Sequence, residues 1–511
     1  MATSITNANL LKTWHLAPAA VRRLDASVDG RYDPTMNNVG FWPHTRPRST
    51  LATTIFLVLV VCLVAAGAVA RPGVAHARAV ARGIADYTII SMSADQQATA
   101  LHEIRSELGA TYVRFFVSWR AAEPRQGAYD RGSLYMAGVA SAVSQAHDDG
   151  LKVMISFQNV PEWASAHKYW PQTGGYQPYD AISTTYLPDY EAFCQAVAAQ
   201  FRGQVYAYEC WNEPNLWTSL FPQTTRQDKD FAAHLYVKML RSFSAGIRAG
   251  AGTTALRVAG ATAPAGSATP NDIYSTSPQR FAATIKATKG WSSLFDAYSH
   301  HPYTIGAPEA APTNSKSDVT LQNLGVLLKL FPDKPFFLTE YGYQTAACQA
   351  FLGWHVNQVT QANYLRRAYS FAARYRQVKL LMWYLVKDYS PPKAPYQGWY
   401  TGLRTAGGAA KRAWFVFAGG NRLTLDAPSS VKRGTSLTLG GQLACKSVGG
   451  LSGKALVVQS HRPGRPWYTL KTVKSQAAGL YAVLLRPKAS AYYRVAWLGV
   501  VTSRSRYVAV H

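Results

Sequence analysis

Eight short apolar runs alternate with amphipathic stretches between about residue 84 and residue 418, and this alternation constrains the fold most strongly. Several runs are nearly continuous in hydrophobic residues, as expected of parallel strands that are buried on both faces. The expected strands cover residues 85–93, 111–119, 151–158, 205–211, 256–263, 295–303, 335–342 and 379–386. Apolar residues recur at helical spacing between them, most clearly over residues 94–108, 190–203, 231–250 and 361–376.

Eight strand–helix units in this length predict an α/β fold of the (β/α)8 type, the TIM barrel. The alternative is a doubly wound open sheet, which often carries a glycine-rich phosphate loop after its first strand. No such loop follows the first apolar run. The barrel is therefore the favoured fold.

The pattern changes beyond residue 420, where short alternating strands are separated by Gly, Pro and Ser. This texture predicts a small C-terminal β-sandwich of the Ig-like kind. We divide the chain into a lead and signal segment (1–77), a barrel domain (78–420) and a basic accessory domain (421–511). The accessory domain holds fourteen Lys and Arg and one acid, Asp426, a net charge of +13 out of +26 for the chain. Contact with an anionic cell-wall polymer or an acidic glycan is one interpretation, and a generally basic surface is the other.

The first 77 residues decide where the chain is expected to work. A lead ends in the basic segment HTRPR (44–48), and residues 51–70 are then uncharged. The helix breaker RPG (71–73) and the small-residue pattern AHA (75–77) follow, an order typical of an export signal. The apolar run is also long enough to be an uncleaved membrane anchor. In both interpretations the lead is cytoplasmic and the remainder is secreted or held at the cell surface.

Composition excludes several classes of function. The basic charge is spread out, without a long Lys/Arg run or a known nucleic-acid-binding motif, so we expect no nucleic acid partner. No cysteine–histidine spacing indicates a metal site and no cofactor fingerprint occurs, so we expect neither a metal nor a cofactor. We expect a monomer. Cys194, Cys210, Cys348 and Cys445 allow three disulfide pairings, between which the sequence does not choose.

Polar and aromatic side chains gather at the carboxyl ends of the expected strands, where barrel active sites form. Glu213 in ECWNEPN and Glu340 in FFLTEYGY each follow a strand directly. Cleavage of a glycosidic bond needs two such carboxyl groups, because one protonates the departing sugar oxygen while the other attacks the anomeric carbon or activates water. The expected substrate-binding residues at the same end are Arg114, Asn159, Trp163, Asn212, His301, Tyr303 and Trp383.

These motifs resemble those of glycoside hydrolase clan A. SHHPY after the sixth strand and LLMWYL in the eighth match further elements of the clan, in the correct order after NEP and together with TEYG. The opening YVRFFVSWRAAEPRQGAYD and the segment VPEWAS look most like families 39 and 5. The resemblance covers about residues 84–418. It implies a retaining TIM-barrel glycosidase that acts on a poly- or oligosaccharide.

The resemblance also implies roles for the residues that match. Glu213 would be the acid/base, which requires a raised pKa, and Glu340 would be the nucleophile of a double displacement. The two carboxyl groups would lie about 5–5.5 Å apart, the separation of retaining enzymes. Arg114 would lower the pKa of Glu340, and the Tyr303 hydroxyl would hold its attacking oxygen.

The resemblance gives the remaining residues contacts with the sugar. Asn212 would bond the 2-hydroxyl, His301 would orient the sugar or the acid/base, and Trp383 would form the floor of the subsite for the covalently bound sugar. Each has a structural alternative: His301 could be a core histidine, Trp163 could be core packing, and Arg114 could pair with an acid such as Asp296.

Two other functions remain open from the sequence. One is a non-catalytic glycan-binding protein on a degenerate barrel, and the other is a surface transglycosidase. The sugar and its linkage stay open as well. Exo or endo action depends on whether the loops at 166–188 and 304–318 close the cleft.

Overall fold

The computed structural model of the chain describes residues 79–166, 176–351 and 353–511. The expected export segment, with its apolar run at 51–70, lies outside these residues. Among the helices of the described part, none is both long enough and apolar enough to cross a membrane.

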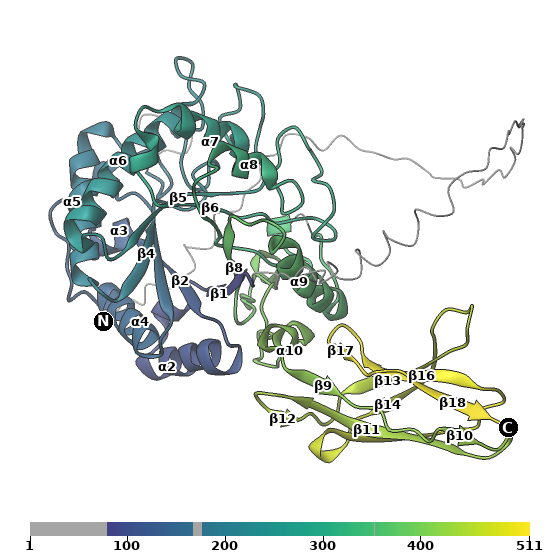
Figure 1. The fold of residues 1–511 in the computed structure, drawn as a ribbon. Coiled ribbons are helices and arrows are strands. Elements are labelled where there is room, and N and C mark those ends of the chain that lie inside the picture. Colours follow the sequence, from purple (N-terminus) through teal and green to yellow (C-terminus); the bar gives the residue numbers. More distant parts are fainter. Residues whose placement is uncertain (1–78, 167–175, 352) are drawn as a thin grey trace, which may run out of the picture. The chain divides into compact units, whose positions relative to one another are not determined.

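Eight parallel strands close into a barrel in chain order, and the first pairs with the last (Figure 1). The expected TIM barrel is therefore confirmed. The strands are β1 (Ala81–Ala85), β2 (Tyr112–Ser118), β3 (Lys152–Gln158), β4 (Val205–Glu209), β5 (Leu256–Thr262), β6 (Ala297–His300), β7 (Phe336–Leu338) and β8 (Val378–Tyr384).

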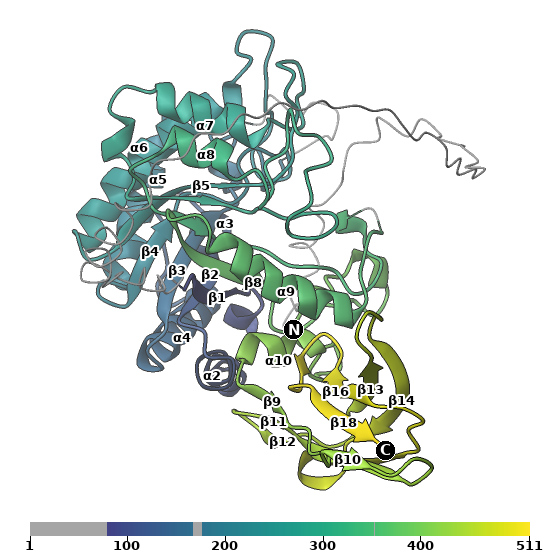
Figure 2. The same cartoon turned by 45° about the vertical axis from the view of Figure 1, so that its right-hand side comes forward.

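Helices surround the barrel, and α5 and α6 lie side by side against its outside (Figures 1 and 2). Their amphipathic pattern explains this packing: in α6, buried residues such as Leu240, Phe243 and Ile247 recur every three to four positions. The helices are α2 (Ala94–His102), α3 (Trp119–Ala122), α4 (Leu134–Asp148), α5 (Leu187–Gln200), α6 (Phe231–Ala251), α7 (Pro278–Ala287), α8 (Gly325–Leu330), α9 (Gln358–Ala372) and α10 (Arg412–Ala418). The expected helix at 94–108 is interrupted, because a π-helical turn at Glu103–Glu107 follows α2.

The first strand lies earlier than the sequence analysis predicted. The prediction placed it at 85–93, whereas β1 ends at Ala85 and a short 3-10 turn occupies Ile89–Ser91. The cause is the next residue, Asp86, whose carboxylate accepts both the backbone N–H (3.0 Å) and the hydroxyl (2.7 Å) of Thr88. An aspartate that bonds two residues ahead turns the chain out of the extended conformation.

The pleat of the strands separates the core into two layers. Met154, Ala207 and Met382 belong to a cluster that fills the barrel interior, while their neighbours in sequence pack outward against the helices. Ser156 and Glu209 come two residues after Met154 and Ala207, so they face the interior as well. The interior near the carboxyl ends of the strands is therefore polar and charged.

The C-terminal residues form the expected β-sandwich of two sheets (Figure 2). One sheet has the order β10-β18-β16-β13-β14 with β17 beside β16, and the other has the order β12-β11-β15 with β9 beside β11. The strands are β9 (Asn421–Leu423), β10 (Ser430–Val431), β11 (Leu437–Cys445), β12 (Gly449–Gly450), β13 (Ala455–His461), β14 (Tyr468–Lys474), β15 (Leu480–Leu485), β16 (Ala491–Trp497), β17 (Val501–Thr502) and β18 (Arg506–Val510). Cys194, Cys210 and Cys445 are buried free thiols.

Candidate active site

Glu213 lies in a strained and tightly held turn. After β4 ends, Trp211 and Glu213 have left-handed backbone angles, with φ of 69° and 45°. Such angles cost about 1–3 kcal/mol each in residues with side chains, and they persist only where the surroundings impose them. The backbone N–H of Glu213 donates to Ala261 (2.9 Å), and the buried Asn215 amide oxygen accepts a backbone N–H of the segment after β5. The turn therefore holds Glu213 at a fixed place at the carboxyl end of β4.

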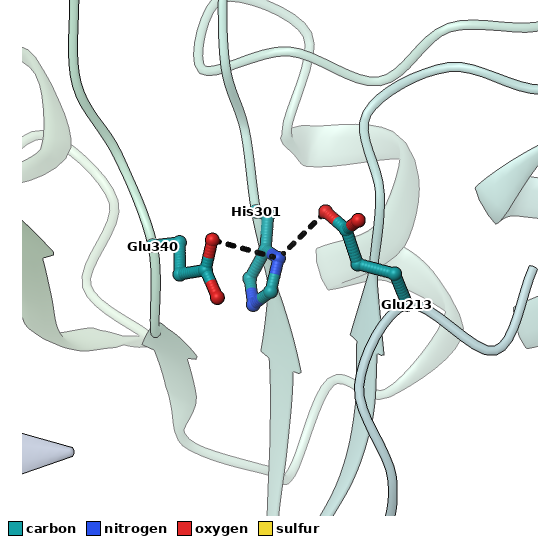
Figure 3. Close-up of side chains that lie close together, drawn as sticks. All are labelled: Glu213, His301 and Glu340. Atoms are coloured by element: carbon teal, nitrogen blue, oxygen red, sulfur yellow. Dashed lines mark hydrogen bonds and ion pairs between the residues drawn. The ribbon is translucent and has the colours of Figure 1, made fainter. Parts of the chain in front are cut away.

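The two predicted catalytic carboxyl groups meet at His301, which follows β6 (Figure 3). Nδ1 of His301 lies 2.9 Å from Oε1 of Glu213 and 3.8 Å from Oε2 of Glu340. One oxygen of each carboxyl group and the imidazole nitrogen all lie within 4.8 Å of one another. Glu213 and Glu340 are only 1% and 5% exposed. The expectation that these three residues converge is met.

Arg114 on β2 connects Glu340 to a third buried carboxylate. Its Nη1 donates to Oε1 of Glu340 (2.7 Å), and its Nε donates to Oε2 of Glu209 (2.8 Å). The alternative pairing with Asp296 is wrong, because Asp296 binds Arg257 (2.8 Å). A guanidinium shared by two buried acids compensates a charge that the interior could not otherwise hold.

Asn212 and Tyr303 complete the contacts of this charged group. The amide oxygen of Asn212 accepts from Nη2 of Arg114 (2.7 Å), which fixes the amide orientation and leaves its NH2 group as the donor for a ligand. The Tyr303 hydroxyl donates to Oε2 of Glu340 (3.2 Å), as the resemblance implied. Glu340 therefore receives one hydrogen bond on each of its oxygens.

The two carboxyl groups have different electrostatic surroundings. Burial raises the pKa of Glu213 well above its ordinary value, and the nearby Glu340 charge raises it further. Burial also raises the pKa of Glu340, but the charge of Arg114, its hydrogen bond and that of Tyr303 oppose the rise. Arg114 thus limits the increase and does not produce the net decrease that we expected. Arg114 and Tyr303 therefore favour the ionised form of Glu340, whereas burial and the nearby charge favour the protonated form of Glu213.

Hydrogen-bond polarity, combined with the lowered pKa of His301, supports the same assignment. Glu209 accepts from Arg114, and its other oxygen accepts the hydroxyl proton of Thr339 (3.0 Å). The Thr339 hydroxyl oxygen lies 3.1 Å from Nε2 of His301. Because the only proton of this hydroxyl is directed to Glu209, the hydroxyl oxygen must accept a hydrogen bond from Nε2 of His301.

His301 is consequently protonated on Nε2. Burial lowers its pKa well below the ordinary value, with the charges of Arg114 and His300 adding to the effect, so the ring is neutral. A neutral ring with a proton on Nε2 has only a lone pair on Nδ1. The 2.9 Å contact with Glu213 is then a hydrogen bond only if Glu213 is the protonated partner.

The prediction for Trp383 is wrong. Its side chain is fully buried on the outer side of the barrel, where its indole N–H donates to the Thr401 carbonyl (2.8 Å). The reason is the period of two along a strand: Trp383 faces the helix layer, and the next residue faces the interior. That residue is Tyr384, and its ring centroid lies 5.1 Å from that of Trp399.

Trp163 and Asn159 lie after β3, and the described contacts connect neither of them to the two glutamates. The indole N–H of Trp163 donates to the Glu123 carbonyl (3.1 Å), and its ring packs edge-on against Trp119 and Tyr186. Trp163 also lines a surface pocket with Tyr186. Asn159 has a left-handed backbone, and its amide oxygen is buried without a partner among the described residues. Binding of substrate by these two residues stays a prediction.

Glu209 and Thr339 were not predicted as site residues. A signal was present, because an acid within the apolar run VYAYECW and an arginine within YVRFFVSW are both charges that a buried strand cannot leave unpaired. Glu213, His301 and Glu340 also have the residue types of a metal site. The guanidinium already bound to Glu340 disfavours a second cation there.

Solved structures of several glycoside hydrolases align with this chain at low sequence identity. A family 39 glycoside hydrolase from the gut symbiont Bacteroides cellulosilyticus WH2 aligns with a TM-score of 0.49 and 17% identity, over 80% of this chain and 81% of that chain. A GH5_18 protein from Streptomyces cattleya gives 0.47 and 16%, over 66% and 79%. A GH30 endoxylanase from Clostridium papyrosolvens C71 gives 0.43 and 9%, over 80% and 94%. A search of curated proteins gives no match.

Residues 80–387, which are more than half of the chain, match the family described as Cellulase (glycosyl hydrolase family 5). This family model confirms the resemblance to clan A, and to its family 5, that the motifs indicated. With its closed barrel and its paired glutamates, the chain is a glycoside hydrolase that belongs to glycosyl hydrolase family 5.

Proposed function

We propose that the protein is a retaining glycosidase, with Glu213 as acid/base and Glu340 as nucleophile. The observation that carries the proposal is the separation of their oxygens, within 4.8 Å, together with their different partners. Retaining enzymes have carboxyl groups about 5–5.5 Å apart, whereas inverting enzymes leave about 6.5–9.5 Å for a water molecule.

The reaction then runs in two balanced steps. In the first, Glu340 attacks the anomeric carbon, the bond to the leaving oxygen breaks, and Glu213 gives its proton to that oxygen. In the second, ionised Glu213 takes a proton from water, the hydroxide oxygen bonds to the anomeric carbon, and Glu340 leaves as a carboxylate. The sugar keeps its anomeric configuration because it is inverted twice.

The neighbouring residues support these steps. Arg114 and Tyr303 hold Glu340 as an ionised nucleophile, each through one oxygen. The NH2 group of Asn212 is the donor for the sugar 2-hydroxyl. In place of Trp383, the ring pair of Tyr384 and Trp399 is our candidate for the sugar-stacking floor, since it faces the barrel interior.

Aryl glycosides of several sugars test this function. We expect the wild type to hydrolyse at least one of them with retained configuration, read by NMR of the first-formed anomer. Glu340→Ala removes the nucleophile and Glu213→Gln removes the acid while keeping an N–H donor to His301, so both variants lose activity. Equal activity in all three proteins, or inverted product, would refute the assignment. Transfer to an added sugar acceptor in preference to water would instead identify a transglycosidase.

We further propose an extracytoplasmic site of action and a glycan contact for the C-terminal sandwich. The export pattern of residues 51–77 supports the first. The excess of fourteen basic residues over one acid in residues 421–511 supports contact with an acidic glycan. Fractionation of cells that express the full chain, with detection of the sandwich in the medium or on the cell surface, tests the location. Retention in the cytoplasm would refute it.

A further inference from the structure

Four ring side chains form a continuous row across one sheet of the sandwich. The strand register pairs His461 of β13 with Tyr492 of β16, and Tyr492 with Tyr507 of β18. Ring centroids lie 5.1 Å apart between Trp467 and His461, 6.0 Å between His461 and Tyr492, and 5.0 Å between Tyr492 and Tyr507. Because paired residues share a face, His461, Tyr492 and Tyr507 stand on the same side of the sheet, and Trp467, which precedes β14, stacks on His461.

This side of the sheet faces solvent. Tyr507 and Tyr492 are 50% and 37% exposed, whereas their neighbours Val508 and Tyr493 are buried in the sandwich core. Single exposed aromatic residues are common on proteins, but adjoining ones mark a binding surface more often. Their flat, partly apolar faces suit the faces of sugar rings.

The charge of the sheet specifies what kind of sugar chain fits. Asp426 is the only acid of residues 421–511, and it pairs through its backbone with Gly440 in the other sheet. Arg494 belongs to the same face as the ring row, with its guanidinium 4.1 Å from the Trp467 ring centroid and its Nε donating to Gln459 (2.8 Å). Among the described residues, the two terminal nitrogens of Arg494 have no hydrogen-bond partner, so they can bind a carboxylate in a bidentate manner.

We infer that the row Trp467–His461–Tyr492–Tyr507, with Arg494 beside it, binds a carboxylate-bearing polysaccharide. The rings contact the sugar faces, and Arg494 pairs with a uronate carboxylate. This inference rests on the proposed glycan contact of residues 421–511 and does not depend on hydrolysis. A single-stranded nucleic acid also combines anionic charge with stacking surfaces. A polysaccharide is favoured because the chain belongs to a family that acts on glycosidic bonds.

Binding is measured with the full chain carrying Glu340→Gln, so that no bound chain is cleaved. The probe is polygalacturonate. Its methyl-esterified form keeps the rings without the charge, polyglutamate keeps the charge without the rings, and polyuridylate represents nucleic acid. We expect polygalacturonate to bind at least about tenfold more tightly than the other three, a ratio that one hydrogen-bonded ion pair or one stacking contact supplies.

Variants locate the site. Tyr492→Ala and Tyr507→Ala should each weaken polygalacturonate binding about tenfold, and Arg494→Gln should reduce the preference for acid over ester. The matched control is Tyr468→Ala. Tyr468 is 46% exposed, between the values for Tyr492 and Tyr507. It pairs with the inward-facing Ser460, so it lies outside the row. Thermal unfolding verifies that each variant is folded.

The following outcomes overturn the inference. Equal binding of the methyl ester would show that the carboxylate charge contributes nothing, and equal binding of polyglutamate would show that the sugar rings contribute nothing. Tighter binding of polyuridylate would identify a nucleic acid surface. Unchanged affinity in the two tyrosine variants, or no binding at all, would refute the site. An inactive wild type that still binds through this row would refute only the proposed hydrolysis.

Discussion

The hydroxyl of Thr339 is the most informative group to remove. It donates to Glu209 (3.0 Å) and accepts from Nε2 of His301 (3.1 Å), and it thereby sets the imidazole tautomer that faces Glu213. Thr339→Val keeps the shape of the side chain and removes both hydrogen bonds. In the variant, the His301 proton gains a partner by moving to Nδ1, where it would donate to Glu213 and favour the ionised carboxylate.

The size of the effect follows from the bond that is lost. A buried N–H without a partner costs about 1–3 kcal/mol. In Thr339→Val this cost destabilises the tautomer of His301 that carries its proton on Nε2. At 1.36 kcal/mol per pKa unit, the pKa of Glu213 should fall by about 1–2 units. In the proposed mechanism the active form has Glu213 protonated, so the variant should lose its activity at a lower pH than the wild type does as the pH rises. The alkaline limb of the kcat/KM profile should move down by about 1–2 pH units.

The assay is a pH profile on an aryl glycoside whose poor leaving group needs protonation. Thr339→Ser is the matched control, since it restores the hydroxyl and should restore the wild-type limb. A dinitrophenyl glycoside, whose leaving group needs little protonation, should show a smaller loss in Thr339→Val at high pH. An alkaline limb in Thr339→Val that coincides with the wild type would refute the tautomer argument.

Three further changes test the site. Burial raises the pKa of Glu213 in the folded state, so the stability that this residue contributes is full below its unfolded pKa and is lost as pH rises through its folded pKa. Glu213→Gln should therefore gain in Tm relative to the wild type as pH increases. A Tm difference that does not change with pH would contradict this. Arg114→Met leaves Glu209 and Glu340 buried without their cation. It should lower the free energy of unfolding, measured in urea, by about 3–5 kcal/mol at neutral pH and by less in acid. A loss below about 1 kcal/mol would show that these ion pairs are not needed for stability. Trp383→Phe should lower the free energy of unfolding by about 1 kcal/mol through the lost indole bond and leave KM unchanged, whereas a raised KM would return this residue to the sugar subsite.

The barrel could be predicted from the sequence because its strands are buried on both faces and so appear as continuous apolar runs. Glu213, His301 and Glu340 could be placed together because strands of a barrel all end at one rim. Two failures have physical causes. Residue types alone did not show that the side chain of Asp86 would end β1. A one-residue error at the end of β8 exchanged the inner and outer faces, so Trp383 was predicted where Tyr384 lies.

Glu209 illustrates a different limit. Its importance depends on contacts with Arg114 and Thr339, which lie 95 and 130 positions away in the chain. A sequence pattern can show that a buried acid needs a partner, but it does not show which of several cations and hydroxyls will supply it. Only the closed barrel brings β2, β4 and β7 close enough to make the choice.

The shared guanidinium and the fixed tautomer have a consequence for the covalent intermediate of the proposed mechanism. In the resting site the charges of Arg114, Glu209 and Glu340 sum to minus one, with Glu213 and His301 neutral. When Glu340 becomes an ester and Glu213 gives up its proton, the sum is still minus one, and the negative charge has only moved across the histidine. The interior need not accept any additional charge during the first step. Ionised Glu213 then faces the Nδ1 lone pair, and this repulsion favours its recovery of a proton from the incoming water.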